Sequence, residues 1–96
     1  MKSKLVPVVL AASAIAVLAG CSAKVVDRDS CASETRAAWQ ELDLAKAEGF
    51  SGTVSYSKAL ALLSAAKTQQ QVEAYRGCVK NAEKARFYIR ESRAGR

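Results

Sequence analysis

Residues 31–49 read CASETRAAWQELDLAKAEG, and their periodicity is the main indication of the fold class. Small and apolar side chains recur here at alternating spacings of four and three residues, at Cys31, Thr35, Ala38, Leu42 and Ala45. Polar side chains occupy the other side, at Arg36, Gln40, Asp43 and Glu48. This periodicity predicts an amphipathic helix over about residues 31–48, with Asp29 or Ser30 as its N-cap. Gly49 stands where a left-handed C-terminal cap is expected, and Phe50 can then pack back on the last turn.

A loop and a second helix follow this segment. Residues 50–54 read FSGTV, and their Ser, Gly and Thr interrupt the apolar pattern. The second helix is predicted over residues 56–67, with Ser55 as its N-cap. Its apolar positions are Tyr56, Ala59, Leu60, Leu63 and Ala66.

A third helix is predicted over residues 69–92. Thr68 and Gln71 have the spacing of a capping box, which indicates a break between the second and third helices. The core positions of the third helix are Tyr75, Cys78, Ala82, Ala85 and Ile89, with Val72 and Val79 at the edge. The alternative is one continuous helix over residues 56–92, because neither Gly nor Pro interrupts residues 57–76. In both cases the fold class is all-α, a small three-helix bundle or a helical hairpin over residues 30–96.

The N-terminal segment has the organisation of an export signal. Lys2 and Lys4 precede an apolar run over residues 5–18, which is short for a membrane-spanning helix. The run ends in Leu18-Ala19-Gly20-Cys21, which resembles the lipobox of bacterial lipoprotein precursors. The resemblance implies that residues 1–20 are a signal peptide and that Cys21 becomes the lipid-bearing first residue. The alternative is an ordinary secretory signal followed by an unrelated cysteine.

The same resemblance predicts where the mature chain resides. Two or more acyl chains hold a protein stably on a bilayer. Ser22 follows the lipid-bearing cysteine, whereas an Asp there resembles the inner-membrane retention signal of enteric-type bacteria. The implied location is therefore the outer membrane, with the domain anchored on its periplasmic face. Residues 21–29 are predicted to form a short extended tether that keeps the domain close to the membrane.

Two further cysteines, Cys31 and Cys78, fall on the apolar stripes of their predicted helices. An even number of cysteines in a small exported domain predicts a disulfide between them. In the chain-entropy model, closing a loop of this length is worth roughly 4 kcal/mol, which matters for a thin, Ala-rich core. The alternative is a pair of buried free thiols.

Basic residues are concentrated at the C-terminal end of the chain. Residues 76–96 have a net charge of +5, whereas residues 21–75 have a net charge of −1. The outer face of the third predicted helix carries Lys80, Lys84 and Phe87, and Arg90 flanks it. An exposed Phe among cations predicts a contact surface for a partner or for anionic lipid. The alternatives are a solvated helix face and a Phe ring covered by the C-terminal tail.

The composition argues against catalysis. The chain contains no His, which removes the commonest general base and a common zinc ligand. The acidic residues of the first helix are predicted to lie mainly on its solvent side, at Glu34, Glu41, Asp43 and Glu48. We therefore expect no enzyme, no cofactor, no metal site and no small-molecule substrate. Nucleic acid is not an expected partner of a periplasmic domain.

The mature chain also resembles small helical lipoproteins of proteobacteria and the tetratricopeptide repeat. The residues that carry these resemblances are Tyr56-Ser57-Lys58-Ala59-Leu60 and Tyr75, Cys78, Ala82 and Ala85, with Ala82 in place of the second aromatic of the repeat. The implied role is a non-catalytic interaction or structural module of the cell envelope that binds an envelope protein or peptidoglycan. The alternative is a cationic membrane-active or envelope-stress lipoprotein that acts on anionic lipid.

Overall fold

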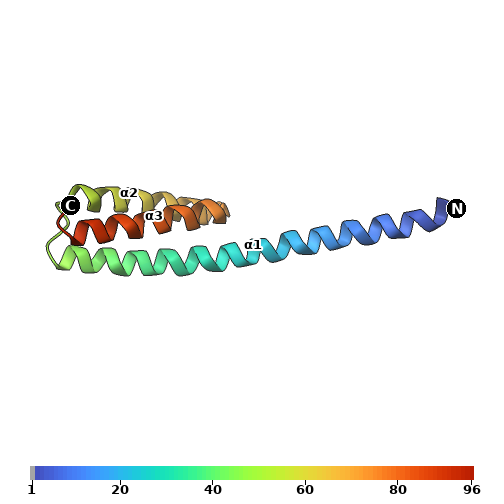
Figure 1. The fold of residues 1–96 in the computed structure, drawn as a ribbon, viewed down its shortest axis with the longest axis horizontal. Coiled ribbons are helices and arrows are strands. Elements are labelled where there is room, and N and C mark those ends of the chain that lie inside the picture. Colours follow the sequence, from blue (N-terminus) through green and yellow to red (C-terminus); the bar gives the residue numbers. More distant parts are fainter. Residues whose placement is uncertain (1) are drawn as a thin grey trace.

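The structure, a computed structural model, describes the backbone of residues 2–96 and the side chains of residues 24–96. It contains three helices: α1 (Lys2–Ala47), α2 (Val54–Gln71) and α3 (Tyr75–Arg93). The helices α2 and α3 lie side by side against the C-terminal part of α1 (Figure 1). As a result α1 and α3 run in the same direction and α2 runs in the opposite one. The predicted all-α three-helix bundle is confirmed.

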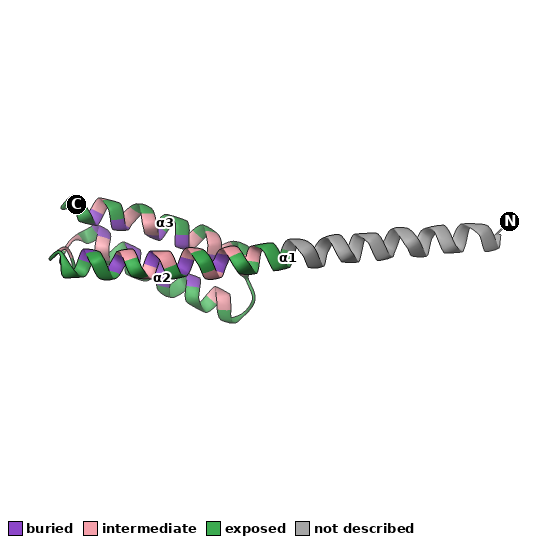
Figure 2. Ribbon diagram, turned by 90° about the horizontal axis from the view of Figure 1, so that it is seen from below, coloured by how far each residue is buried: buried purple, intermediate pink, exposed green. Residues whose placement is uncertain are grey.

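The core forms where the buried stripes of the three helices meet, along the inner faces coloured purple in Figure 2. The predicted stripe of α1 is buried at every position, at Cys31, Thr35, Ala38, Leu42 and Ala45. The buried stripe of α3 has the same four-and-three spacing, at Cys78, Ala82, Ala85, Ile89 and Ser92. Each of these α3 residues follows its α1 counterpart by 47 positions. Because α1 and α3 are parallel and their buried residues have the same spacing, each buried residue of α1 lies beside its counterpart on α3 along the whole bundle.

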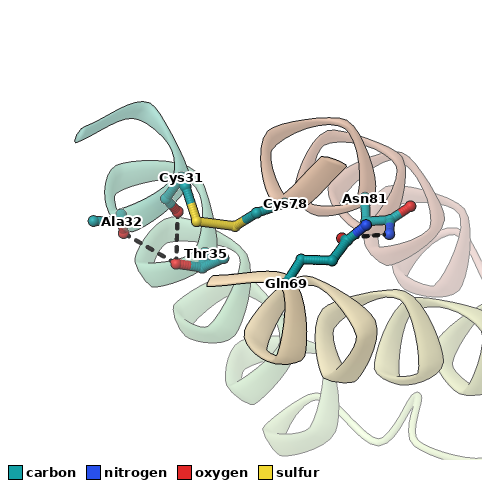
Figure 3. The surroundings of a disulfide bond; sticks show 6 residues. All are labelled: Cys31, Ala32, Thr35, Gln69, Cys78 and Asn81. Atoms are coloured by element: carbon teal, nitrogen blue, oxygen red, sulfur yellow. Dashed lines mark hydrogen bonds between the residues drawn. A yellow bond between two sulfur atoms is a disulfide. The ribbon is translucent and has the colours of Figure 1, made fainter. Parts of the chain in front are cut away.

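A disulfide between Cys31 and Cys78 joins the two stripes at the end of the bundle nearest the α2–α3 turn (Figure 3). The Cα atoms of the two residues are 5.5 Å apart, and both side chains are fully buried. Thr35, one turn further along α1, donates its hydroxyl to the Cys31 carbonyl at 2.7 Å. The structure therefore brings the two cysteines together as the disulfide prediction requires, and the free-thiol alternative is not what it describes.

The extended tether predicted for residues 21–29 is wrong over its described part. The backbone of residues 24–30 belongs to α1, and the helix continues without interruption to Ala47, one residue short of the predicted end at residue 48. Residues 24–47 contain neither Gly nor Pro. Because adding residues to an existing helix is far easier than starting one, the packed part of α1 propagates toward the N-terminus.

All three helices end in the same capping motif. The second residue after the end of each helix has a positive φ: Gly49 at 94°, Glu73 at 62° and Gly95 at 84°. The next amide then donates to the carbonyl five residues back, as Phe50 to Ala45, Ala74 to Gln69 and Arg96 to Glu91, at 2.9, 2.8 and 3.0 Å. This is the Schellman arrangement, which usually places Gly at the left-handed position. The predicted roles of Gly49 and Phe50 are confirmed.

The start of α2 differs from the prediction. Thr53 is the N-cap, and its hydroxyl accepts a hydrogen bond from the Tyr56 amide at 3.2 Å. The hydroxyl of the buried Ser92 lies 2.8 Å from that of Thr53 and donates to the Phe50 carbonyl at 3.2 Å. Ser55, predicted as the cap, is instead buried inside the first turn of α2. The N-cap prediction failed because the cap is set by the contact of this loop with Ser92 of α3, and a local sequence pattern does not reveal a contact between residues so far apart.

The break between α2 and α3 also lies later than predicted. α2 continues to Gln71 rather than residue 67, and α3 begins at Tyr75 rather than residue 69. Thr68 stays inside α2, where its hydroxyl donates to the Ser64 carbonyl at 3.2 Å, so the predicted capping box is wrong. The alternative of one continuous helix over residues 56–92 is wrong as well. The break is made by Glu73 in a left-handed conformation, and no Gly marks it.

The disulfide predicts a large dependence of stability on oxidation. Its loop spans 47 residues, for which the chain-entropy model gives roughly 4 kcal/mol. We expect the double variant Cys31→Ala/Cys78→Ala to lose an amount of this order in its free energy of unfolding. Urea unfolding followed by circular dichroism, with the reduced natural chain alongside, measures the loss. A loss below about 1 kcal/mol in both samples would contradict the prediction.

Glu73 predicts a stabilising substitution. A residue with a Cβ atom is disfavoured in the left-handed region by about 1 kcal/mol, and the other two caps use Gly. Glu73→Gly should therefore raise the free energy of unfolding by about 1 kcal/mol. Glu73→Gln is the matched control, because it removes the exposed ion pair with Lys24 but keeps the backbone cost. Equal changes in the two variants would show that the charge, and not the backbone, is responsible.

Candidate functional site

The predicted lipidation site and signal peptide, Cys21 and residues 1–20, lie outside the residues whose side chains are described. Within residues 24–96, no helix is both long enough and apolar enough to cross a membrane. The same residues contain no cluster of three His, Cys, Asp or Glu side chains suited to a metal ion.

The predicted contact surface of α3 is exposed, but it does not form one patch. Lys80, Lys84, Phe87 and Arg90 are all exposed, and Phe87 retains 49% of its accessible surface. Lys84 lies on the side of α3 that faces α2, where it lines a groove with Leu62. Arg90 lies on the opposite side and lines a recess against α1 with Glu34 and Arg86. The structure therefore places Lys84 and Arg90 on different sides of α3, with Phe87 about one turn from each.

The groove between α2 and α3 is lined by Lys58, Ala61, Leu62, Lys84 and Tyr88 and has a volume of about 390 Å³. We call these five residues the α2–α3 groove. The ammonium group of Lys58 lies 5.3 Å from the centre of the Tyr88 ring, in a cation–π contact. Tyr88 also meets Phe87 edge to face, with ring centres 5.2 Å apart. The half-buried Tyr88 ring in the groove thus contacts a cation, Lys58, and the exposed ring of Phe87.

Arginines on the α1 side of α3 have a structural role. Arg86 donates to Glu41 at 2.7 Å and to Glu34 at 2.9 Å, and it is only 31% exposed. Its hydrogen bonds to Glu41 and then to Glu34 raise the pKa of Arg86, which keeps the guanidinium charged. One heptad further on, Arg93 pairs with Glu48 at 2.6 Å. These pairs connect the two parallel helices beside the core.

The prediction that the acidic side chains of the first helix lie mainly on its solvent side is therefore wrong for Glu34 and Glu41, which are partly buried against Arg86, whereas Glu48 is exposed and pairs with Arg93. Glu34, Glu41 and Glu48 are spaced seven residues apart and form a row that faces the arginines of α3. Asp43 is exposed, as predicted. The hydrogen bond from Arg93 lowers the pKa of Glu48, so this pair persists above that lowered pKa and weakens as the pH falls through it. The row is an interhelical contact and not a paired-carboxylate catalytic site.

A second concave region lies at the end of the bundle formed by the α2–α3 turn. Its lining includes Lys24, Asp27, Glu73, Tyr75 and Arg76. The charges there compensate one another, because Lys24 pairs with Glu73 at 3.6 Å and Arg76 pairs with Asp27 at 3.9 Å. This region therefore presents no net charge to a ligand.

Sequence reasoning missed the contributions of Lys58, Leu62 and Tyr88. Whether a residue lines a groove between two helices depends on where each helix begins, and the predicted starts of both were displaced. One sequence signal was available: residues 54–71 contain Lys58 and Lys67 but no Asp or Glu. A helix with cations alone has no internal partners for them, which points to a charged outer face.

Comparison of the chain with protein-family models, with curated proteins and with solved structures finds no match.

The Arg86 ion pairs predict a stability cost for their removal. Arg86→Met keeps most of the apolar stem but leaves Glu34 and Glu41 facing each other without a cation, so we expect a loss of about 1–2 kcal/mol. Arg93→Met removes a more exposed pair and should cost less. Urea unfolding at low and high salt measures both. Equal losses, or no loss for Arg86→Met, would contradict a special role for Arg86.

Proposed function

We propose that this protein is a lipid-anchored, non-catalytic docking module of the bacterial cell envelope. In this proposal Cys21 holds it on the periplasmic face of the outer membrane, and the face shared by α2 and α3 binds another envelope component. The observation that carries the proposal is the exposed Phe87, whose ring contacts Tyr88 of the α2–α3 groove. The Phe87 ring contacts Tyr88 with its edge and leaves about half of its surface to solvent, and large aromatic rings are frequent anchors of protein interfaces.

The position of the anchor supports the same proposal. Cys21 precedes the first described side chain, that of Lys24, by three residues, and α1 continues from there into the bundle. A helix rises 1.5 Å per residue, so the lipid would hold the α2–α3 turn near the membrane surface. The side of the bundle that carries Phe87 would then extend into the periplasm, where an envelope protein or peptidoglycan can reach it.

The alternative, a cationic protein that acts on anionic lipid, is weakened by where the charges lie. Arg86 and Arg93 are engaged by glutamates of α1, and Arg96 pairs with Glu91 at 2.6 Å. Much of the positive charge of residues 76–96 therefore stabilises the fold instead of facing a membrane. The cations left on the outer face of α3 are few, and they stand beside an apolar groove.

Site-specific crosslinking in cells tests the proposed function. A photoreactive amino acid at position 87 of the full chain should yield a discrete adduct with an envelope protein or with peptidoglycan fragments. The matched control is position 40, an exposed site on α1 far from the groove, which should yield several-fold less of that adduct. Cys21→Ser should remove the lipid and reduce both membrane retention and the adduct. No adduct from position 87, or equal adducts from both positions, would exclude this docking surface.

A further inference from the structure

The α2–α3 groove has a regular internal geometry. α2 supplies Lys58 and, one turn later, Leu62, whereas α3 supplies Lys84 and, one turn later, Tyr88. Because the two helices run in opposite directions, Lys58 is level with Tyr88, which it contacts, and Leu62 is level with Lys84. The two lysines therefore stand diagonally across the groove, at opposite ends of an apolar floor made by Leu62, Ala61 and the Tyr88 ring.

The charge of the groove is not balanced by the chain itself. Neither Lys58 nor Lys84 forms an ion pair with any described carboxylate, whereas Arg86 and Arg93 of α3 pair with glutamates near α1. α2 contains no Asp or Glu at all. Of the two acidic residues of α3, Glu83 lines the recess on the α1 side with Arg86 and Arg90, and Glu91 is held by Arg96 through two hydrogen bonds at 2.6 and 3.4 Å. The groove thus offers two unpaired ammonium groups around an apolar surface.

We infer that the α2–α3 groove binds an acidic peptide segment of an envelope protein, with one apolar side chain seated between two carboxylates. This inference rests on the proposed docking function and specifies its partner. The apolar side chain packs on Leu62 and the Tyr88 ring, where Phe87 extends the contact. The two carboxylates accept hydrogen bonds from Lys58 and Lys84. A basic or uncharged peptide meets the same apolar floor but leaves both ammonium groups without partners.

The position of the groove favours a peptide over a lipid bilayer. By the 47-residue register, Lys84 is level with Ala37 of α1, sixteen residues beyond Cys21. That separation corresponds to about 24 Å along a helix. The potential of a charged membrane decays within about 8 Å at physiological ionic strength. With the anchor end of the bundle at the membrane, the two lysines therefore lie outside the field of the headgroups.

Peptide binding by the full lipidated chain in uncharged detergent micelles tests the inference. The probe is a fluorescent hexapeptide of alternating Glu and Leu, compared with Lys–Leu and Glu–Ser hexapeptides by fluorescence anisotropy. We expect the Glu–Leu peptide to bind at least about tenfold more tightly than the other two. Lys58→Glu/Lys84→Glu should weaken that binding at least about tenfold. Lys46→Glu/Lys67→Glu changes the net charge equally at exposed sites outside the groove and should change the peptide affinity less than about twofold.

If the charge-reversed groove variant fails to fold, Lys58→Met/Lys84→Met keeps the apolar stems and should still reduce binding. Equal binding of the three peptides, or equal losses in the groove and control variants, would overturn the inference. A second measurement tests whether the groove contacts the lipid bilayer instead. It compares the acetylation rates of Lys58 and Lys84 with that of Lys67 on the full chain in nanodiscs. If anionic but not zwitterionic nanodiscs slow the acetylation of Lys58 and Lys84 in the absence of peptide, the groove binds lipid and the inference of a peptide ligand is wrong.

These outcomes separate the inference from the function on which it rests. An envelope adduct at position 87 without binding of the Glu–Leu peptide would support the docking function and would contradict the inference that its partner is an acidic peptide. Binding of the Glu–Leu peptide without any envelope adduct would show that the groove prefers acidic peptides and would contradict the proposed docking function.

Discussion

The alignment of α1 with α3, fixed by the disulfide between Cys31 and Cys78, is the constraint on which the rest of the structure depends. The stripes that meet in the core consist largely of Ala, Cys, Thr and Ser, with Leu42, Leu63 and Ile89 as the only large apolar side chains that are fully buried among the described residues. Small side chains bury little area each, so sliding α1 along α3 by one heptad would cost modest packing energy. A covalent bond between the stripes removes that freedom. The core can then be thin and still specify one register.

Other interhelical contacts follow from that register. With an offset of 47 residues, the row of Glu34, Glu41 and Glu48 on α1 comes to face Arg86 and Arg93 on α3. The end of α3 also comes level with the loop after α1, where Ser92 bonds to the Phe50 carbonyl and to the N-cap of α2. The position of α2 is therefore fixed through α3 as well as through its own loop. The α2–α3 groove is a consequence of this chain of contacts.

How far the sequence predicts this structure depends on the range of the interaction concerned. The stripe of α1, its Gly49 cap and the pairing of the cysteines follow from local periodicity and composition, and all three agree with the structure. The start of α2 and the break before α3 do not, because Thr53 is selected by a contact with Ser92 and the break occurs at a left-handed Glu73. For the contact surface, helical phase correctly placed Lys80, Lys84 and Phe87 on the outside of α3. It could not supply the residues of α2, nor show that the flanking Arg90 lines a recess against α1.

The two long sides of α3 divide its cations by chemistry as well as by position. Those that pair with α1 are arginines, whose planar guanidinium groups can bond two carboxylates at once, as Arg86 does with Glu41 and Glu34. The cation on the α2 side, Lys84, and the one that meets it across the groove, Lys58, are lysines, which carry a compact charge on a flexible stem. A rigid bidentate group suits a contact that must hold one register. A mobile ammonium group suits a contact that forms and breaks with a partner, and it can lie over an aromatic ring, as Lys58 does over Tyr88, until a carboxylate replaces that weaker interaction.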